Sequence, residues 1–162
     1  MTYMTKGLGP LLRLAGFGLA SLGWAAAAQA AAVNEAAMRA LESDGTEWLS
    51  YDRTWAQQRF SPLQQIDTES VDKLGLTWSI DLDNNRGLEA TPLYHEGVLY
   101  TSLSWSRVMA VDAGTGQILW SYDPQVDKAK GRDACCDAVN RGVALWQGKV
   151  YVGTLDGRLI AL

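Results

Sequence analysis

The stretches Gly97–Val111, GVLYTSLSWSRVMAV, and Gly148–Leu162, GKVYVGTLDGRLIAL, are two copies of one pattern. They align without gaps at an offset of 51 residues, so that Arg107 matches Arg158. Each copy reads as two short strands around a turn, and the second copy turns at Asp-Gly, a strong hairpin signal. The sequence therefore predicts a repeated β-hairpin unit.

The chain around the first copy extends this unit. Residues 112–123, DAGTGQILWSYD, supply a further turn and a strand with Trp120. Residues 71–82, VDKLGLTWSIDL, lead into another predicted strand, in which WSID at Trp78 echoes WSYD at Trp120. Short strands, glycine turns and a tryptophan at a period of about 40–50 residues are typical of a β-propeller. We expect an all-β fold with about two blades; a β-sandwich with similar hairpins is the alternative.

The N-terminal 30 residues have the layout of a secretory signal peptide. Lys6 and Arg13 precede the apolar run LAGFGLASLGWAAAA, which ends in Ala-Gln-Ala at Ala30. That order favours a cleaved signal over a membrane anchor. We expect residues 31–162 to act in the periplasm, an oxidising compartment, with no stable membrane span after cleavage. This mature part begins with a predicted short helix, Asn34–Ser43, with Asn34 as its N-cap.

Charge and length restrict the function further. The chain of 162 residues has a formal net charge of −4, and without the two basic residues of the signal the balance is −6. An acidic chain of this kind argues against nucleic acid as a partner. The sequence ends on DGRLIAL, an apolar strand pattern without a following turn. We therefore expect a fragment of a longer protein.

The chain's two cysteines, Cys135 and Cys136, are adjacent in the stretch DACCDAVNRG. Neighbouring Cα atoms lie about 3.8 Å apart, whereas relaxed disulfides span roughly 4.4–6.8 Å. A bridge between them would be strained, and strain of that kind is found at functional sites. Two free thiols or a redox-sensing switch are the alternatives, because strain makes a disulfide easier to reduce.

Four stretches together carry a family resemblance: WLSYDRTWAQQRFSPLQQI, GLEATPLYHEGVLY, VMAVDAGTGQILWSYDP and CCDAVNRGVALWQGKVYVGTLDGRLIAL. From about Asn34 to the last residue, the chain resembles the N-terminal part of pyrroloquinoline quinone (PQQ)-dependent alcohol dehydrogenases. The resemblance implies the first blades of an eight-bladed β-propeller, and AVDAGTGQILW resembles the tryptophan docking motif that joins those blades. Asp52, where a glycine is expected, and Trp55, in place of a tyrosine, depart from the family pattern.

The same resemblance assigns cofactor-binding residues. It implies that a Cys135–Cys136 disulfide packs on one face of the quinone rings and that Arg141 binds the polar rim of the quinone, where a planar guanidinium suits carboxylate and carbonyl oxygens. Glu89 resembles the family's acidic contact to the cofactor. The alternatives are a surface ion pair between Arg141 and Asp137, and a solvated loop position for Glu89.

The reaction implied by the resemblance is oxidation of a small alcohol to an aldehyde with PQQ as cofactor. The calcium ligands, the catalytic base and the tryptophan that covers the quinone would lie beyond residue 162, so we expect no catalytic or metal-binding residue in this chain and no activity from it alone. A cytochrome c-type protein would accept the electrons. The sequence decides neither between calcium and a lanthanide nor whether haem c is present. A non-catalytic periplasmic β-propeller scaffold is the alternative, although it would need no vicinal disulfide followed by Asn-Arg-Gly.

Overall fold

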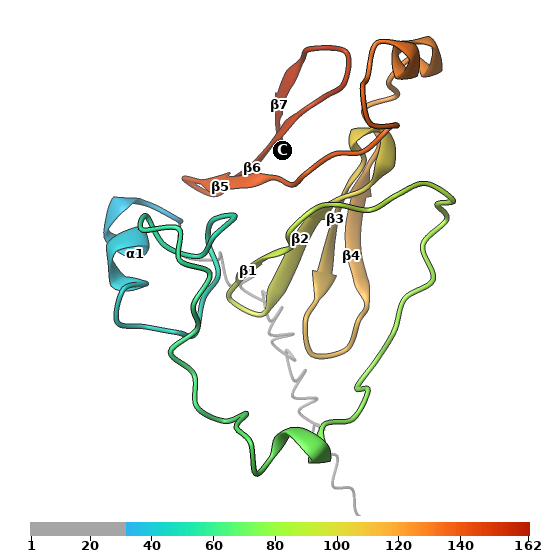
Figure 1. The fold of residues 1–162 in the computed structure, drawn as a ribbon. Helices are drawn as coiled ribbons and strands as arrows, with labels where there is room; N and C mark the ends of the chain where they lie inside the picture. The colour runs from blue at the N-terminus through green and yellow to red at the C-terminus, as the bar shows by residue number, and fades with distance from the viewer. Residues whose placement is uncertain (1–31) are drawn as a thin grey trace, which may run out of the picture.

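A computed structural model describes residues 32–162, so the predicted signal peptide lies outside the described residues. Two antiparallel sheets form the fold, one in the order β1-β2-β3-β4 and one in the order β5-β6-β7 (Figure 1). This arrangement confirms the all-β expectation. The strands are β1 (Leu93–His95), β2 (Val98–Ser102), β3 (Val108–Asp112), β4 (Ile118–Tyr122), β5 (Ala144–Trp146), β6 (Lys149–Gly153) and β7 (Leu159–Ala161). The helical elements are α1 (Glu35–Ala40) and the 3₁₀ turns η1 (Val71–Lys73), η2 (Ser104–Ser106) and η3 (Lys128–Arg132).

The internal repeat is visible as two hairpins of the same kind. The β1–β2 hairpin turns at Glu96 and Gly97, and the β5–β6 hairpin turns at Gln147 and Gly148. All four residues have positive φ, between +45° and +82°, as in the type I′ turns that match the twist of antiparallel strands. The predicted repeat itself is confirmed by the strands that follow each turn, because β2 and β3 pair as the hairpin of the first copy and β6 and β7 as that of the second.

The two matched arginines of the repeat make matched contacts. Arg107 donates a hydrogen bond from Nη2 to the carbonyl oxygen of Asp83 at 2.9 Å. Arg158 donates from Nη2 to the carbonyl oxygen of Pro124 at 2.7 Å. Each of these carbonyls lies shortly after a Trp-Ser pair in the sequence. Both arginines therefore fasten their own hairpin to the chain segment that precedes it.

Trp78 attaches its segment to the first sheet through its side chain. Its Nε1 donates a hydrogen bond to the carbonyl oxygen of Ala113 at 2.9 Å. The indole ring lies against Gly116, which has a φ of +75°, and a Cβ added there would be 2.7 Å from two carbon atoms of the ring. Glycine at this turn thus permits both the backbone conformation and the close approach of the ring.

The strand expected within residues 71–82 is absent from the described structure. Val71–Lys73 forms the turn η1, and residues 74–82 pair with no strand. A β-strand needs a neighbouring strand to satisfy its backbone groups, and no strand among residues 32–162 pairs with this segment, which packs on the first sheet through its side chains. The apolar alternation around Trp78 therefore reflects side chains that pack on the first sheet, and the strand prediction is wrong for these residues.

The N-terminal helix forms where the sequence predicts it. The Asn34 side chain accepts a hydrogen bond from the Ala37 N–H at 3.0 Å, as an N-cap does. The helix ends at Ala40, short of the expected end at Ser43, and the chain then turns. Arg53, 5% exposed, donates hydrogen bonds to carbonyl oxygens in that turn, among them Leu41 at 2.6 Å.

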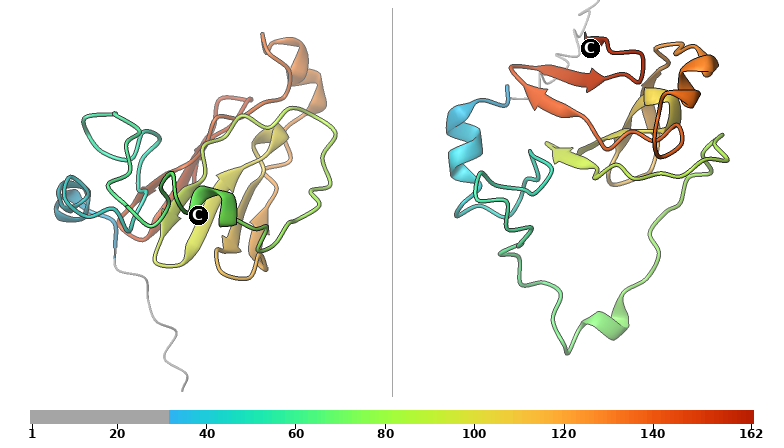
Figure 2. Two further views of the ribbon diagram at one scale, coloured as in Figure 1. Left: turned by 60° about the horizontal axis from the view of Figure 1, so that its bottom comes forward. Right: turned by 45° about the horizontal axis from the view of Figure 1, so that its top comes forward.

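The main core lies where the N-terminal segment meets both sheets. Figures 1 and 2 show α1 beside the sheet formed by β5, β6 and β7. Buried apolar side chains from α1, its flanking segments, the first sheet and the second sheet form one cluster there, which stabilises the fold by removing apolar surface from water. The cluster consists of Val33, Met38, Leu41, Leu49, Leu93, Val108, Leu145, Val150 and Val152.

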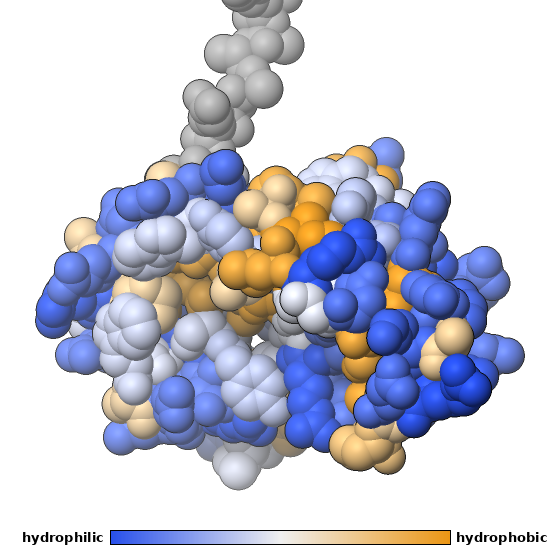
Figure 3. Space-filling view, turned by 90° about the horizontal axis from the view of Figure 1, so that it is seen from above, coloured by the Kyte–Doolittle hydropathy of each residue, from blue (hydrophilic) through white to orange (hydrophobic). Residues whose placement is uncertain are grey.

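Other apolar side chains remain on the surface. Viewed from above, hydrophobic residues gather across the middle of the face, with hydrophilic residues around them (Figure 3). Strand β4 leaves Ile118, Leu119 and Trp120 exposed, and Leu159 of β7 is 76% exposed. Among residues 32–162, no helix has the length and apolar character needed to cross a bilayer.

Candidate functional site

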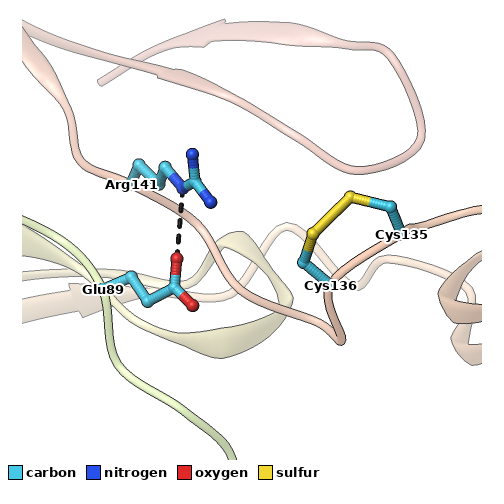
Figure 4. The surroundings of a disulfide bond; sticks show 4 residues. All are labelled: Glu89, Cys135, Cys136 and Arg141. Carbon is cyan, nitrogen blue, oxygen red and sulfur yellow. Dashed lines mark hydrogen bonds and ion pairs between the residues drawn. A yellow bond between two sulfur atoms is a disulfide. The ribbon is translucent and has the colours of Figure 1, made fainter.

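The predicted site residues lie on two segments that precede corresponding hairpins. Glu89 is in the chain that leads into β1, and Arg141 is in the chain that leads into β5. The cystine is on the long connection between β4 and β5, after η3. Figure 4 shows Arg141 and Glu89 pointing toward each other, with the cystine further along the same connection. The structure therefore brings residues 89 and 141 together although they are distant in the sequence.

Cys135 and Cys136 form a disulfide, with their Cα atoms 3.8 Å apart. Both residues are exposed, so the disulfide lies at the surface of the connection. The next residue, Asp137, has a φ of +69° and accepts a hydrogen bond from Arg86 Nη1 at 2.9 Å. Asp137 is thus paired with Arg86, and the alternative surface pair between Asp137 and Arg141 is not formed.

Arg141 and Glu89 are joined by a hydrogen-bonded ion pair, 3.1 Å from Nε to Oε2. The Arg141 side chain is 68% exposed and that of Glu89 is 43% exposed. Exposed pairs of this kind contribute only about 0–1 kcal/mol to stability. Within residues 32–162, the two terminal nitrogens of Arg141 have no hydrogen-bond partner. The pair orients the guanidinium and leaves its outer edge available to an anionic ligand.

The connection that carries the cystine is supported by Trp105, from the loop between β2 and β3. Lys128 Nζ lies 4.0 Å from the centroid of the Trp105 ring, a cation–π contact. The same ring packs against Gly131, where an added Cβ would be 3.0 Å away. The backbone N–H of Trp105 donates a hydrogen bond to the Ala138 carbonyl oxygen at 2.8 Å. That Trp105 packs against this connection was not predicted from the sequence. A tryptophan flanked by serines between two predicted strands is the only sequence feature that indicates it.

The turn between β6 and β7 borders the same connection. Asp156 accepts hydrogen bonds from Arg158 and from the hydroxyl of Thr154. The Arg158 guanidinium is the main cause, and the Thr154 hydroxyl the second, of a lowering of the Asp156 pKa to about 2. Asp156 is therefore ionised over the whole physiological pH range and acts as a turn-stabilising acceptor.

The described residues include no group of three His, Cys, Asp or Glu side chains arranged to hold a metal ion. His95 has its Nδ1 3.0 Å from Oε2 of Glu47, in a part-buried contact between β1 and the N-terminal segment. That contact holds the N-terminal segment against the first sheet. The candidate site in this part of the chain thus consists of an exposed cystine and the ion pair of a guanidinium with a carboxylate.

Comparison with known proteins places these features in a wider group. Residues 48–162 match the family described as "PQQ: Glucose/ethanol/alcohol dehydrogenase, beta-propeller domain". The chain is 71% identical over 136 residues to quinohemoprotein alcohol dehydrogenase ADH IIB of Pseudomonas putida, covering 84% of the chain and 20% of that protein. It is 58% identical over 116 residues to the dehydrogenase subunit of a quinone alcohol dehydrogenase of Gluconobacter oxydans, covering 72% of the chain and 15% of that protein.

Among solved structures, quinohemoprotein alcohol dehydrogenase ADHIIG of Pseudomonas putida superposes with a TM-score of 0.80 at 51% identity. The match covers 83% of this chain and 20% of that one. The chain thus spans 15–20% of the length of these relatives.

Proposed function

Because this chain belongs to the PQQ β-propeller domain family of glucose, ethanol and alcohol dehydrogenases, we propose that it supplies the N-terminal blades and one wall of the cofactor pocket of a PQQ-dependent alcohol dehydrogenase. The substrate of the complete protein is a small alcohol, which is oxidised to an aldehyde. Bound PQQ would supply the acceptor for the hydride, which carries the two electrons removed from the alcohol, and a base would take the hydroxyl proton. The rest of the pocket comes from outside residues 32–162.

The observation that carries the proposal is the common exposure of the cystine and the Arg141–Glu89 pair on adjoining segments. PQQ is a planar, fused-ring quinone with three carboxylates. The exposed disulfide offers a compact, polarisable surface for the ring face, and the outer edge of the Arg141 guanidinium fits carboxylate or carbonyl oxygens. Glu89 holds the guanidinium in place, and Arg141 offsets the charge of Glu89 toward an anionic ligand.

The propeller and its closure form a second part of the proposal. Trp78 donates to Ala113 and covers Gly116, as a tryptophan that joins neighbouring blades would. Trp120 occupies the corresponding place in the second Trp-Ser pair, on β4 at the edge of the first sheet, and is 36% exposed. We infer that Trp120 docks in the same way on the next blade, within an eight-bladed ring.

Several further assignments rest on the family likeness. Calcium would polarise the quinone as a Lewis acid, with its ligands and the catalytic base outside residues 32–162. Residues 1–30 would direct export to the periplasm as a signal peptide. A cytochrome c-type protein, or a haem c domain of the same protein, would accept the electrons one at a time. A separate piece limited to this chain would be inactive.

The proposal is tested on the complete gene product, exported to a bacterial periplasm with calcium and PQQ present. We would measure PQQ binding by the absorbance of the bound quinone and activity by dye-coupled alcohol oxidation. Arg141→Ala removes one charge-assisted contact, so we expect a PQQ dissociation constant raised by about 10–100-fold. Arg39→Ala is the matched control, because Arg39 is also an exposed arginine paired with a glutamate, Glu35, but lies on α1.

The double variant Cys135→Ala/Cys136→Ala tests the wall formed by the disulfide. We expect weaker PQQ binding and slower alcohol oxidation than in the unsubstituted protein. A folded protein that binds PQQ equally well with and without Arg141 and the cystine would contradict the assigned pocket wall. A folded unsubstituted protein that binds no PQQ would contradict the enzyme assignment and favour the non-catalytic scaffold.

A further inference from the structure

The side chain of Asn140, the residue before Arg141, is held by hydrogen bonds in three directions. Its Nδ2 donates to the Gly153 carbonyl oxygen at 2.8 Å and to the Ser106 hydroxyl at 3.2 Å. Its Oδ1 accepts from the Gly142 N–H at 3.1 Å. Both amide protons and one acceptor site of Asn140 are therefore in use, an arrangement that fixes which way the amide faces.

Ser106 is the buried end of this network. It is 0% exposed and has a φ of +59°, an uncommon conformation for a residue other than glycine. Its hydroxyl accepts hydrogen bonds from Asn140 and from the Leu155 N–H, the latter at 3.2 Å. A residue is kept in such a conformation only where its surroundings determine it. Here, the surroundings are the connection with the cystine on one side and the β6–β7 turn on the other.

Asn140 thus ties together three parts of the fold. Ser106 belongs to the loop between β2 and β3 in the first sheet, and Gly153 ends β6 in the second sheet. The Gly142 N–H belongs to the chain just after Arg141, and the Asn140 carbonyl oxygen also accepts a hydrogen bond from Ser102 at 3.4 Å. The backbone is therefore anchored immediately before and immediately after Arg141.

This anchoring matters because the ion pair with Glu89 orients the Arg141 guanidinium but by itself holds it only weakly. The pair with Glu89 is exposed on both sides and is worth little. The hydrogen bonds that join Asn140 to Ser106 and to the Gly142 N–H are part-buried, so an unmade bond there carries a larger penalty, whereas the bond to Gly153 is exposed. The direction in which Arg141 leaves the backbone is consequently set by Asn140 and Ser106.

We propose that Asn140 is a positioning residue that, with Ser106, aligns Arg141 for its ligand. The PQQ measurement below rests on the proposed function, whereas the exchange measurement needs no cofactor. Asn140 acts through the backbone of Arg141 and not by contact with the ligand.

The first test is amide hydrogen exchange of the complete gene product without PQQ. In Asn140→Ala we expect the Gly142 amide to exchange about tenfold faster, because its Oδ1 acceptor is lost. Asn140→Asp keeps that acceptor but lacks both Nδ2 protons, so it loses the hydrogen bonds to Ser106 and Gly153. It is the variant to measure if Asn140→Ala does not fold. The exchange should rise less in Asn140→Asp than in Asn140→Ala at Gly142.

The matched control is Asn34→Ala. Asn34 also accepts a backbone N–H through its side chain, but it caps α1 and has no link to the connection. We expect Asn34→Ala to lower stability without changing exchange at Gly142. Unchanged exchange at Gly142 in both Asn140 variants would overturn the positioning role, whatever the protein binds.

The second test is a double-mutant cycle on PQQ affinity. We expect Asn140→Ala to weaken PQQ binding by about tenfold and to add no further loss in the Arg141→Ala background, because it acts through Arg141. Losses that multiply in the double variant would show that Asn140 acts independently and would overturn the proposal. An unsubstituted protein that binds no PQQ would refute the proposed function, and the exchange result alone would then decide the role of Asn140.

Discussion

Replacing Gly116 by alanine should separate backbone strain from the contact made by Trp78. Alanine in a left-handed conformation, here with φ of +75°, costs roughly 1–2 kcal/mol. The added Cβ would lie 2.7 Å from the indole ring, so the ring must move by several tenths of an ångström or more. That movement weakens the 2.9 Å bond from Nε1 to Ala113, worth about 0.5–1.5 kcal/mol, and opens the packing around the ring. We expect a total loss of about 2–4 kcal/mol.

Gly148→Ala is the matched control for this substitution. Gly148 has nearly the same φ, +74°, but an added Cβ would meet no atom within 4 Å. Its loss should therefore be limited to the backbone term of roughly 1–2 kcal/mol. The two variants differ only in whether the added Cβ meets an aromatic ring.

The assay is urea unfolding of the complete gene product, followed by far-ultraviolet circular dichroism, with the midpoint compared among the variants. Gly116→Ala should unfold at clearly lower urea than Gly148→Ala. Trp78→Phe keeps an aromatic ring and removes the Nε1 donor, so it should cost about 1 kcal/mol. Equal midpoints for the two glycine variants would refute the reasoning, because the Trp78 contact would then carry no energy.

Three further substitutions test local interactions. Asp156→Asn should lower stability near neutral pH. The folded-state pKa of Asp156 is lowered to about 2, so the stability that its carboxylate contributes is present above its ordinary pKa and is lost as pH falls toward 2. Thermal melts of the two proteins should therefore converge near pH 2. Arg53→Met should cost about 1–3 kcal/mol in urea unfolding, because it leaves the Leu41 carbonyl oxygen buried without its donor; an unchanged midpoint would exclude that role. Asn34→Ala should cost about 1 kcal/mol through loss of the N-cap, and Asn34→Asp, which keeps an acceptor, should recover most of it.

The parts of the fold that local sequence determines could be predicted. The turn at Asp156–Gly157 follows from the Asp-Gly pair between apolar runs, and the N-cap at Asn34 follows from its place before an alanine-rich stretch. The residues around Trp78 show where this approach fails. An apolar pattern records which side chains are covered, but a strand also needs a partner for its backbone, and the pattern does not contain that partner.

The candidate site was predictable only in part for a similar reason. Cys135 and Cys136 are conspicuous because they are adjacent, and resemblance singled out Glu89 and Arg141. The role of Ser106 has no sequence signal of its own, because a buried serine in a loop between two strands looks like any other loop residue. Its importance comes from three segments that meet only after both sheets have formed.

The matched contacts of Arg107 and Arg158 have a consequence for how such a chain can grow. Each hairpin contains its own arginine, which donates a hydrogen bond to a backbone carbonyl oxygen of the preceding segment. Every residue has such a carbonyl group. A duplicated unit therefore brings its attachment with it and makes no demand on the side chains of its new neighbour. Tandem duplication could lengthen the array unit by unit, while neighbouring side chains diverged freely.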